Sequence, residues 1–187
     1  QKDVAIQEST DVVAKYNRFN NIQSIKSKFT NMPLHEYCIK SSYNSACSGD
    51  YVSANMVKEV IKRGCRFLDF EVFYIKENNI YKPKVAISSD KTFMLLDSKN
   101  SILLDKVLST VATTAFSQNS PNNKDPIFIN LRIKSRDSNI YQAVARSIDA
   151  NLKSIAYDGN ITNKTLLQDV MGKAIIIIDK TVEYDYK

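Results

Sequence analysis

The chain alternates between short apolar runs and longer stretches whose apolar residues recur at helical spacing. Helical spacing is clearest in residues 53–63, which Gly64 follows in the position that ends helices, and in residues 102–116. Short apolar or alternating runs predict strands over residues 37–40, 66–73, 84–88, 126–133 and 173–179. A third helix is predicted over 141–152 and a helical turn over 166–171. The predicted order is strand, helix, strand, strand, helix, strand, helix, strand.

Strands separated by amphipathic helices indicate an α/β fold with parallel pairing and helices packed outside, either a doubly wound sheet or part of a β/α barrel. In such barrels functional side chains gather at the carboxyl ends of the strands. The residues predicted at those ends are Asn44, Asp69, Glu71, Ser88 and Arg132.

The first part of the chain differs from the rest. Residues 1–32 are polar and rich in Asn, Lys and Ser, with one helical pattern from Thr10. Its apolar positions are Val12, Val13, Tyr16 and Phe19. We therefore divide the chain into a helical lead-in, residues 1–32, and one α/β domain, residues 33–187.

Composition narrows the function classes. The formal charge of +6 is spread along the chain rather than gathered in one block, so we interpret the lysines as a solvated surface and expect no nucleic-acid partner. Three cysteines without a CxxC pair indicate free thiols in a reducing compartment, hence an intracellular and not a secreted protein. The longest apolar run, residues 174–178, has the length of a strand and not of a membrane span.

Four segments together resemble one family. They are Pro33-Leu34-His35-Glu36-Tyr37-Cys38-Ile39-Lys40-Ser41-Ser42-Tyr43-Asn44, Lys62-Arg63-Gly64-Cys65-Arg66-Phe67-Leu68-Asp69-Phe70-Glu71-Val72-Phe73, Ala115-Phe116 followed by Pro126-Ile127-Phe128-Ile129-Asn130-Leu131, and Gly172-Lys173-Ala174-Ile175-Ile176-Ile177. These segments resemble the X region of phosphatidylinositol-specific phospholipase C, over about residues 33–180. The resemblance implies a partial or complete TIM-type (β/α) barrel, of which this chain supplies the X half.

The resemblance also implies an active site, from which this sequence departs. The family cleaves phosphodiesters with two histidines, whose imidazoles titrate near neutrality. Those positions fall on Tyr43 and Ser88 here, and neither side chain can carry protons in the same way at neutral pH. The single histidine, His35, lies at the wrong end of its strand, so we expect a surface or packing role for it.

The family's calcium ligands are an Asn and three carboxylates. Asn44, Asp69 and Glu71 match three of them, whereas the fourth falls on Arg132, whose charge repels a divalent ion. We expect the Arg132 guanidinium, or else that of Arg66, to pair with the two acids. The resemblance therefore predicts a vestigial binding pocket of Asn44, Asp69, Glu71, Arg132 and Lys180, with no catalytic residue, no metal and no cofactor.

These departures favour a catalytically inactive phospholipase C-like domain that serves as a structural or binding module. The alternative is a phosphodiesterase that works on phosphatidylinositol-type lipids through Tyr43 and Ser88. A third interpretation is recognition of phosphoinositides at a membrane surface, through Lys and Arg contacts. Only about five strands are predicted where the family barrel has about eight, so protein partners are expected to cover the open edge.

Two segments, residues 67–71 and 131–135, are also similar to X-domain-like proteins of large nucleocytoplasmic DNA viruses. This resemblance implies a cytoplasmic or virion-associated protein.

Overall fold

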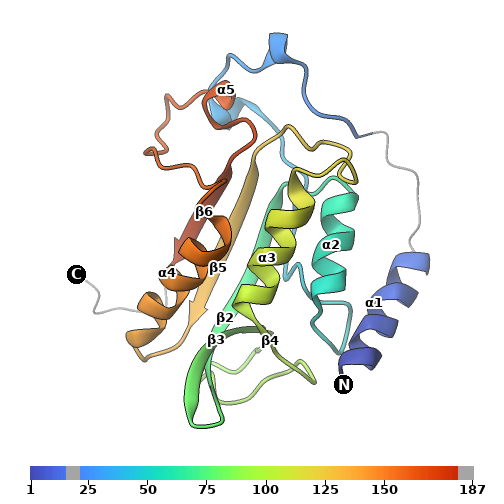
Figure 1. Cartoon of the computed structure of the whole chain (residues 1–187), viewed down its shortest axis with the longest axis vertical. Coiled ribbons are helices and arrows are strands. Elements are labelled where there is room, and N and C mark those ends of the chain that lie inside the picture. The colour runs from blue at the N-terminus through green and yellow to red at the C-terminus, as the bar shows by residue number, and fades with distance from the viewer. Residues whose placement is uncertain (16–21, 181–187) are drawn as a thin grey trace.

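The computed structural model describes residues 1–15 and 22–180, and within these ranges six strands form one sheet (Figure 1). The helices are α1 (Lys2–Lys15), α2 (Ala54–Lys62), α3 (Leu104–Ala115), α4 (Asn139–Leu152) and α5 (Leu167–Val170). The strands are β1 (Ser41–Ser42), β2 (Phe67–Glu77), β3 (Ile80–Ala86), β4 (Ile102–Leu103), β5 (Ile127–Lys134) and β6 (Ala174–Asp179). The sheet order is β4-β3-β2-β5-β6, with β1 beside the first residues of β2.

The pairs β1–β2, β2–β5 and β5–β6 are parallel, as predicted, whereas β3–β4 is antiparallel and β2 and β3 form an antiparallel hairpin. Its turn is Asn78-Asn79, where both residues have positive φ, 50° and 63°, as the tight turns of hairpins require. The predicted strand 84–88 therefore begins earlier, at Ile80, and parallel pairing was wrong here. The polar composition around the turn concealed the continuation of both strands.

Two other boundaries differ from the prediction. Residues 37–40 are not a strand: a short 3-10 turn at Leu34–Glu36 is followed by irregular backbone, and pairing starts only at Ser41. Helix α1 begins at Lys2 rather than near Thr10. Tyr16 and Phe19, which were predicted to continue the helical pattern, lie outside the described residues.

The two faces of the sheet bury different residues. Leu68, Phe70 and Val72 of β2 are fully buried beneath the helices, and α2, α3 and α4 cover this face (Figure 1). Ser53 caps the start of helix α2, because its side chain accepts a hydrogen bond from the Met56 backbone N–H. Side chains alternate along a strand, so the residues between these apolar positions point to the opposite face.

That opposite face would be the interior of a barrel. At the end where β2 and β5 begin it is apolar, because Phe67 and Phe128 stack with ring centroids 6.1 Å apart. Two side chains pack over these rings: Leu34, from the segment before β1, and Leu167 of helix α5. The sheet does not close, so the fold is a mixed α/β partial barrel, which confirms the predicted fold class.

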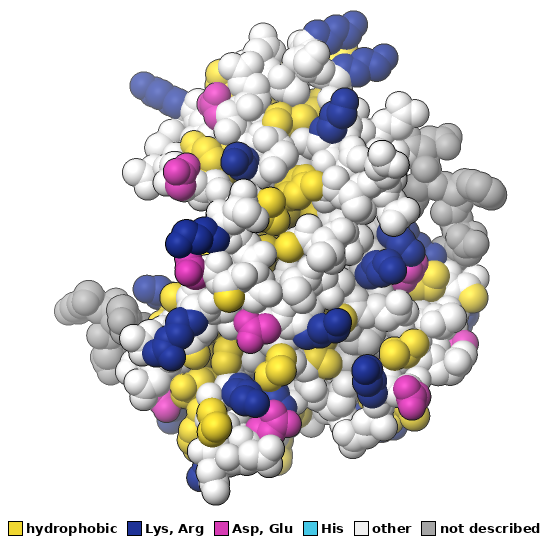
Figure 2. All heavy atoms as spheres, viewed as in Figure 1, with side chains coloured by type: hydrophobic (Ala, Val, Ile, Leu, Met, Phe, Trp, Pro, Cys, Tyr) yellow, Lys and Arg dark blue, Asp and Glu magenta, His cyan; other side chains and the backbone are white. Residues whose placement is uncertain are grey.

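The surface agrees with the scattered charge of the sequence. On the helix-covered face, basic side chains are interspersed with acidic and apolar ones (Figure 2). Within the described residues, no helix has both the length and the apolar character needed to cross a membrane. Cys38, Cys47 and Cys65 are all free thiols.

Candidate functional site

The register of two parallel strands brings the predicted site residues together. Asp69 of β2 lies beside Asn130 of β5, and Glu71 lies beside Arg132. These residues project from the face opposite the helices, because their neighbours in both strands fill the core beneath the helices. The cluster therefore lies near the carboxyl end of β5, as predicted, but in the first half of β2, which continues to Glu77.

Arg132 is the centre of this cluster and contacts both acids. Its Nε and one terminal nitrogen donate to the two carboxylate oxygens of Asp69 at 2.9 and 2.8 Å. The other terminal nitrogen donates to Glu71 Oε1 at 2.7 Å. This fork geometry is the strongest form of guanidinium–carboxylate pairing. The predicted ion network is therefore present in the structure, with Arg132 as the partner.

The loop after β1 completes the cluster. Asn44 accepts a 2.8 Å hydrogen bond from Arg132 at Oδ1, and its backbone N–H donates to Asp69 Oδ2 at 3.1 Å. Its φ of 44° is left-handed, a conformation that Asn tolerates better than most residues. The Tyr43 ring lies against the guanidinium, 4.6 Å from ring centroid to Cζ. Tyr43 therefore packs on Arg132 by a cation–π contact.

The electrostatics of the cluster favour the ionised forms. Burial raises the pKa of Asp69, but hydrogen bonds from Arg132, from the Asn44 backbone and from Asn130 outweigh burial and leave that pKa below its ordinary value. Burial lowers the pKa of Arg132, yet its hydrogen bonds and charge contacts with Asp69 and Glu71 raise it overall. Asp69 and Arg132 therefore stabilise each other in their ionised forms.

The remaining predicted residues are distributed as follows. The Ser88 backbone N–H donates to Glu71 Oε2 at 2.9 Å, which ties the loop after β3 to the cluster. The Lys180 ammonium lies over the Tyr141 ring of α4, 5.2 Å from its centroid. His35 is exposed beside Glu36, in agreement with its predicted surface position.

Arg66 was considered as a partner for Asp69 and Glu71, and this alternative was wrong. Arg66 directly precedes β2 and is two residues from Leu68, so alternation directs its side chain to the helix-covered face and away from the acids. Its hydrogen bonds go to Ala115, Ser120 and Asn122 in the region that follows α3.

Two further residues belong to the cluster, and sequence reasoning missed the first of them. Asn130 donates its side-chain amide to Asp69 Oδ1 at 2.9 Å. Ser45 accepts from the Asp69 backbone N–H at 3.0 Å, through its hydroxyl oxygen. The signal for Asn130 was its place two residues before Arg132 in a buried strand, where alternation puts both on one face.

The arrangement does not fit the calcium ion that the family resemblance implies. All three of the expected oxygen ligands that remain, from Asn44, Asp69 and Glu71, already accept hydrogen bonds from Arg132. A cation at that point would meet the positive guanidinium instead of a fourth carboxylate. Among the described residues, no group of three or more His, Cys, Asp or Glu side chains is arranged to hold a metal ion.

Comparisons with known proteins agree on the fold. A crystal structure of PLC21 from L. pealei superposes with a TM-score of 0.63 at 17% identity, covering 79% of this chain and 18% of that one. The phosphatidylinositol-specific phospholipase C of Listeria monocytogenes superposes with a TM-score of 0.55 at 14% identity, covering 80% of this chain and 53% of the bacterial enzyme. This chain thus spans only part of either protein. No curated protein sequence matches it significantly.

The sequence itself carries the family assignment. The family model described as "Phosphatidylinositol-specific phospholipase C, X domain" matches residues 30–180, which is most of the chain. This range contains β1 to β6 and the whole Arg132 cluster. The chain therefore belongs to the phosphatidylinositol-specific phospholipase C X-domain family.

Proposed function

We propose that this chain is a non-catalytic member of the family that acts as a binding or structural module. The observation that carries the proposal is the position of Arg132, whose guanidinium contacts the Asn44, Asp69 and Glu71 oxygens that a calcium ion would need. Tyr43 supports it, because it stacks on this guanidinium at a position where the family uses a histidine.

The proposal is tested by assaying purified protein on phosphatidylinositol vesicles with added calcium. We expect no release of inositol phosphate. The alternative, a hydrolase that uses Tyr43, predicts turnover that disappears in Tyr43→Phe. Hydrolysis that tracks the protein through purification and is lost in that variant would overturn the proposal.

A calcium titration tests whether Arg132 is what prevents calcium binding. Arg132→Glu restores the fourth carboxylate of the family pattern and removes the guanidinium. We expect calcium to raise the thermal midpoint of this variant but not of the wild type or of Arg132→Gln. A calcium-dependent shift in the wild type would contradict the proposed role of Arg132.

A specific observation favours a membrane surface as the binding partner. In the loop between β3 and β4, Met94 and Leu95 are 81% and 71% exposed. The Asp90 carboxylate holds this loop by accepting hydrogen bonds from the backbone N–H groups of Thr92, Met94 and Leu95. An apolar tip that is already ordered loses little conformational entropy when it enters a lipid interface.

Basic side chains accompany this tip. Lys91 is exposed in the same loop, and the Lys134 ammonium lies 5.5 Å from the centroid of the Phe93 ring. Juxtaposed lysines and apolar side chains suit an anionic membrane surface, where each lysine contributes about 1 kcal/mol. The second candidate function is therefore peripheral attachment to anionic membranes through residues 88–97.

Sedimentation with phosphatidylserine or phosphoinositide vesicles at low and high salt tests this second function. We expect binding that weakens with salt and is lost in Met94→Ser combined with Leu95→Ser. Ile161→Ser is the matched control, because Ile161 is an exposed apolar residue in another loop. Equal sedimentation of all three proteins would leave only the structural role.

The proposal extends to partners and location. Within the described residues, the outer side of β6 makes one isolated bridge, between Ala174 and Ala156. A protein partner that adds strands on this side would therefore continue the barrel wall. An intracellular or virion-associated setting accords with the free thiols and with the viral resemblance. Cross-linking followed by mass spectrometry in the native source would identify the partner and its compartment.

A further inference from the structure

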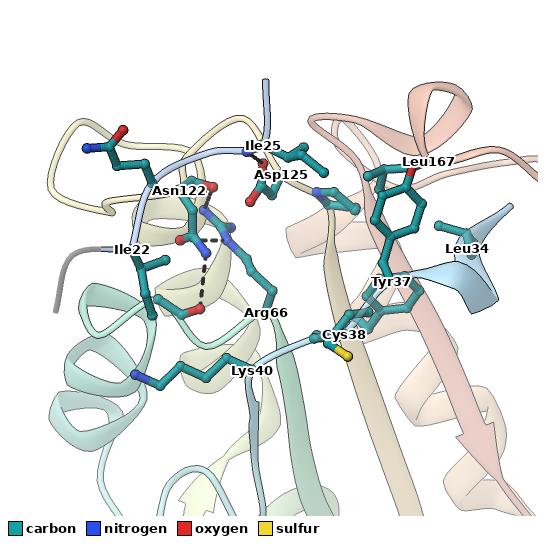
Figure 3. Close-up of a pocket in the computed structure, with 15 residues that line it drawn as sticks. Ile22, Ile25, Leu34, Tyr37, Cys38, Lys40, Arg66, Asn122, Asp125 and Leu167 are labelled. Atoms are coloured by element: carbon teal, nitrogen blue, oxygen red, sulfur yellow. Dashed lines mark hydrogen bonds between the residues drawn. The ribbon is translucent and has the colours of Figure 1, made fainter. Parts of the chain in front are cut away.

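A cavity separate from the Arg132 cluster lies at the end of the sheet where β2 and β5 begin (Figure 3). Its volume is about 390 Å³, within the range of small-molecule sites. The segment before β1 supplies one wall with Ile25, Leu34 and Tyr37, and the sheet supplies Phe128. Leu167 of α5 closes a further side, so the body of the cavity is apolar.

Two cations and one acid line this cavity. Arg66 is only 4% exposed and donates to Asn122 Oδ1 at 3.1 Å, to the Ala115 carbonyl at 2.7 Å and to Ser120 Oγ at 3.0 Å, besides the Asn122 carbonyl. All these acceptors are neutral, and one terminal nitrogen, Nη1, has no hydrogen-bond partner. Burial lowers the pKa of Arg66 to about 10, so the guanidinium remains charged at neutral pH.

With the other two charged residues counted, the lining of the cavity carries a net positive charge. The Lys40 ammonium donates to the Arg63 carbonyl at 2.7 Å, again a neutral acceptor. The acid is Asp125, whose Oδ1 accepts from the Ile25 backbone N–H at 2.9 Å and whose pKa is raised by burial. One carboxylate therefore faces two cations, of which Arg66 is buried without a carboxylate at hydrogen-bond distance.

We propose that this cavity binds a small amphiphilic monoanion, such as a medium-chain carboxylate. The apolar walls take the hydrocarbon, and the single negative charge balances the excess positive charge of the lining. Nη1 of Arg66 is covered, so the head group contacts Lys40 directly. Arg66 attracts it through an intervening layer of low dielectric, where a charge acts more strongly than in water. The inference goes beyond the proposed function and does not depend on it.

The test uses octanoate, below the concentration at which it forms micelles, with ¹H–¹⁵N spectra and calorimetry on the full chain. Octanol and octylammonium, of equal chain length, are the uncharged and cationic controls. We expect octanoate to bind at least about fivefold more tightly than either, a difference of about 1 kcal/mol. The shifted amides should include those of Cys38, Lys40 and Asn122, which line the cavity.

Two variants locate the binding. Lys40→Gln should weaken octanoate about fivefold, and Cys38→Trp should block it, because Cys38 lines the cavity and is exposed. Lys164→Gln, an exposed lysine in another loop, is the matched control and should have no effect. Met94→Ser should also leave octanoate binding unchanged, which separates this cavity from the membrane-binding loop.

Phosphatidylserine vesicles distinguish the two natural sources of such an anion. Shifts at Cys38 and Lys40 with vesicles would identify a membrane lipid as the ligand, and shifts with octanoate alone would identify a free carboxylate. Equal affinity for octanoate and octylammonium, or shifts that map away from these residues, would overturn the proposal.

Discussion

Two arginines, one at each end of the same strand pair, are held in opposite ways. Arg132 pairs with two carboxylates, and these contacts raise its pKa. Arg66 is held by carbonyl, amide and hydroxyl oxygens, and burial lowers its pKa to about 10. Neutral oxygens can thus accept most of the hydrogen bonds of a buried guanidinium, but only a carboxylate partner also neutralises its charge.

The two sites therefore differ in whether their charge favours an anion. The charge of Arg132 is more than balanced by two carboxylates, so the cluster has no attraction for an anion. Arg66 has no carboxylate at hydrogen-bond distance and interacts with Asp125 only at longer range, so the neighbouring cavity, which Lys40 also lines, favours an anion. The predictions below test this contrast through stability and its dependence on pH.

The largest effect is expected for Arg132→Leu, which leaves Asp69 and Glu71 as buried like charges without a cation. We expect a loss of about 3–5 kcal/mol in the free energy of unfolding at neutral pH. The folded-state pKa of Asp69 is lowered, so the stability that its pairing provides is present above the unfolded pKa and is lost as pH falls through the folded value. The deficit of the variant should therefore shrink on acidification, as measured by urea unfolding at several pH values.

Lys134→Leu is the control for this experiment, since Lys134 is two residues further along the same strand. Its ammonium packs on the Phe93 ring rather than on an acid, and we expect a loss of about 0.5–1 kcal/mol. Equal losses in the two variants would show that the ion network contributes no particular stability.

An intermediate effect is expected for Arg66→Lys, which keeps the charge but cannot reach all the acceptors around it. Leaving the Ala115 carbonyl or Asn122 without a donor should cost about 2 kcal/mol. These acceptors do not titrate, so the deficit should change little between neutral and mildly acidic pH. A deficit that followed pH as in Arg132→Leu would mean that a carboxylate, and not neutral oxygens, stabilises Arg66.

The smallest effect is expected for Tyr43, which is 73% exposed above Arg132. Tyr43→Leu should lose about 0.5–1 kcal/mol with the cation–π contact, and Tyr43→Phe should lose almost nothing because the ring remains. Thermal unfolding of both variants measures the contact. A large loss in Tyr43→Phe would assign the phenol a role that the geometry does not provide.

Sequence reasoning reached the Arg132 cluster because the relevant signal is local. Alternation along a strand places Asp69 and Glu71 on one face, and the resemblance to the family's calcium ligands added Arg132, which the parallel register of the structure places beside Glu71. The surroundings of Arg66 were not accessible in this way, because its acceptors come from residues 115–122, about fifty positions away. The β2–β3 hairpin was missed for a different reason, since its Asn78-Asn79 turn interrupts the apolar pattern.

The two borders of the sheet have unequal consequences for assembly. On one border β3 carries Pro83, which has no N–H, and is followed outward only by the two-residue β4. Such features discourage the addition of further strands. The β6 border has neither feature, because its Ala174–Asp179 backbone has no proline and follows a regular parallel register with β5. We therefore expect further strands to add to the sheet beside β6 and not at the β4 border.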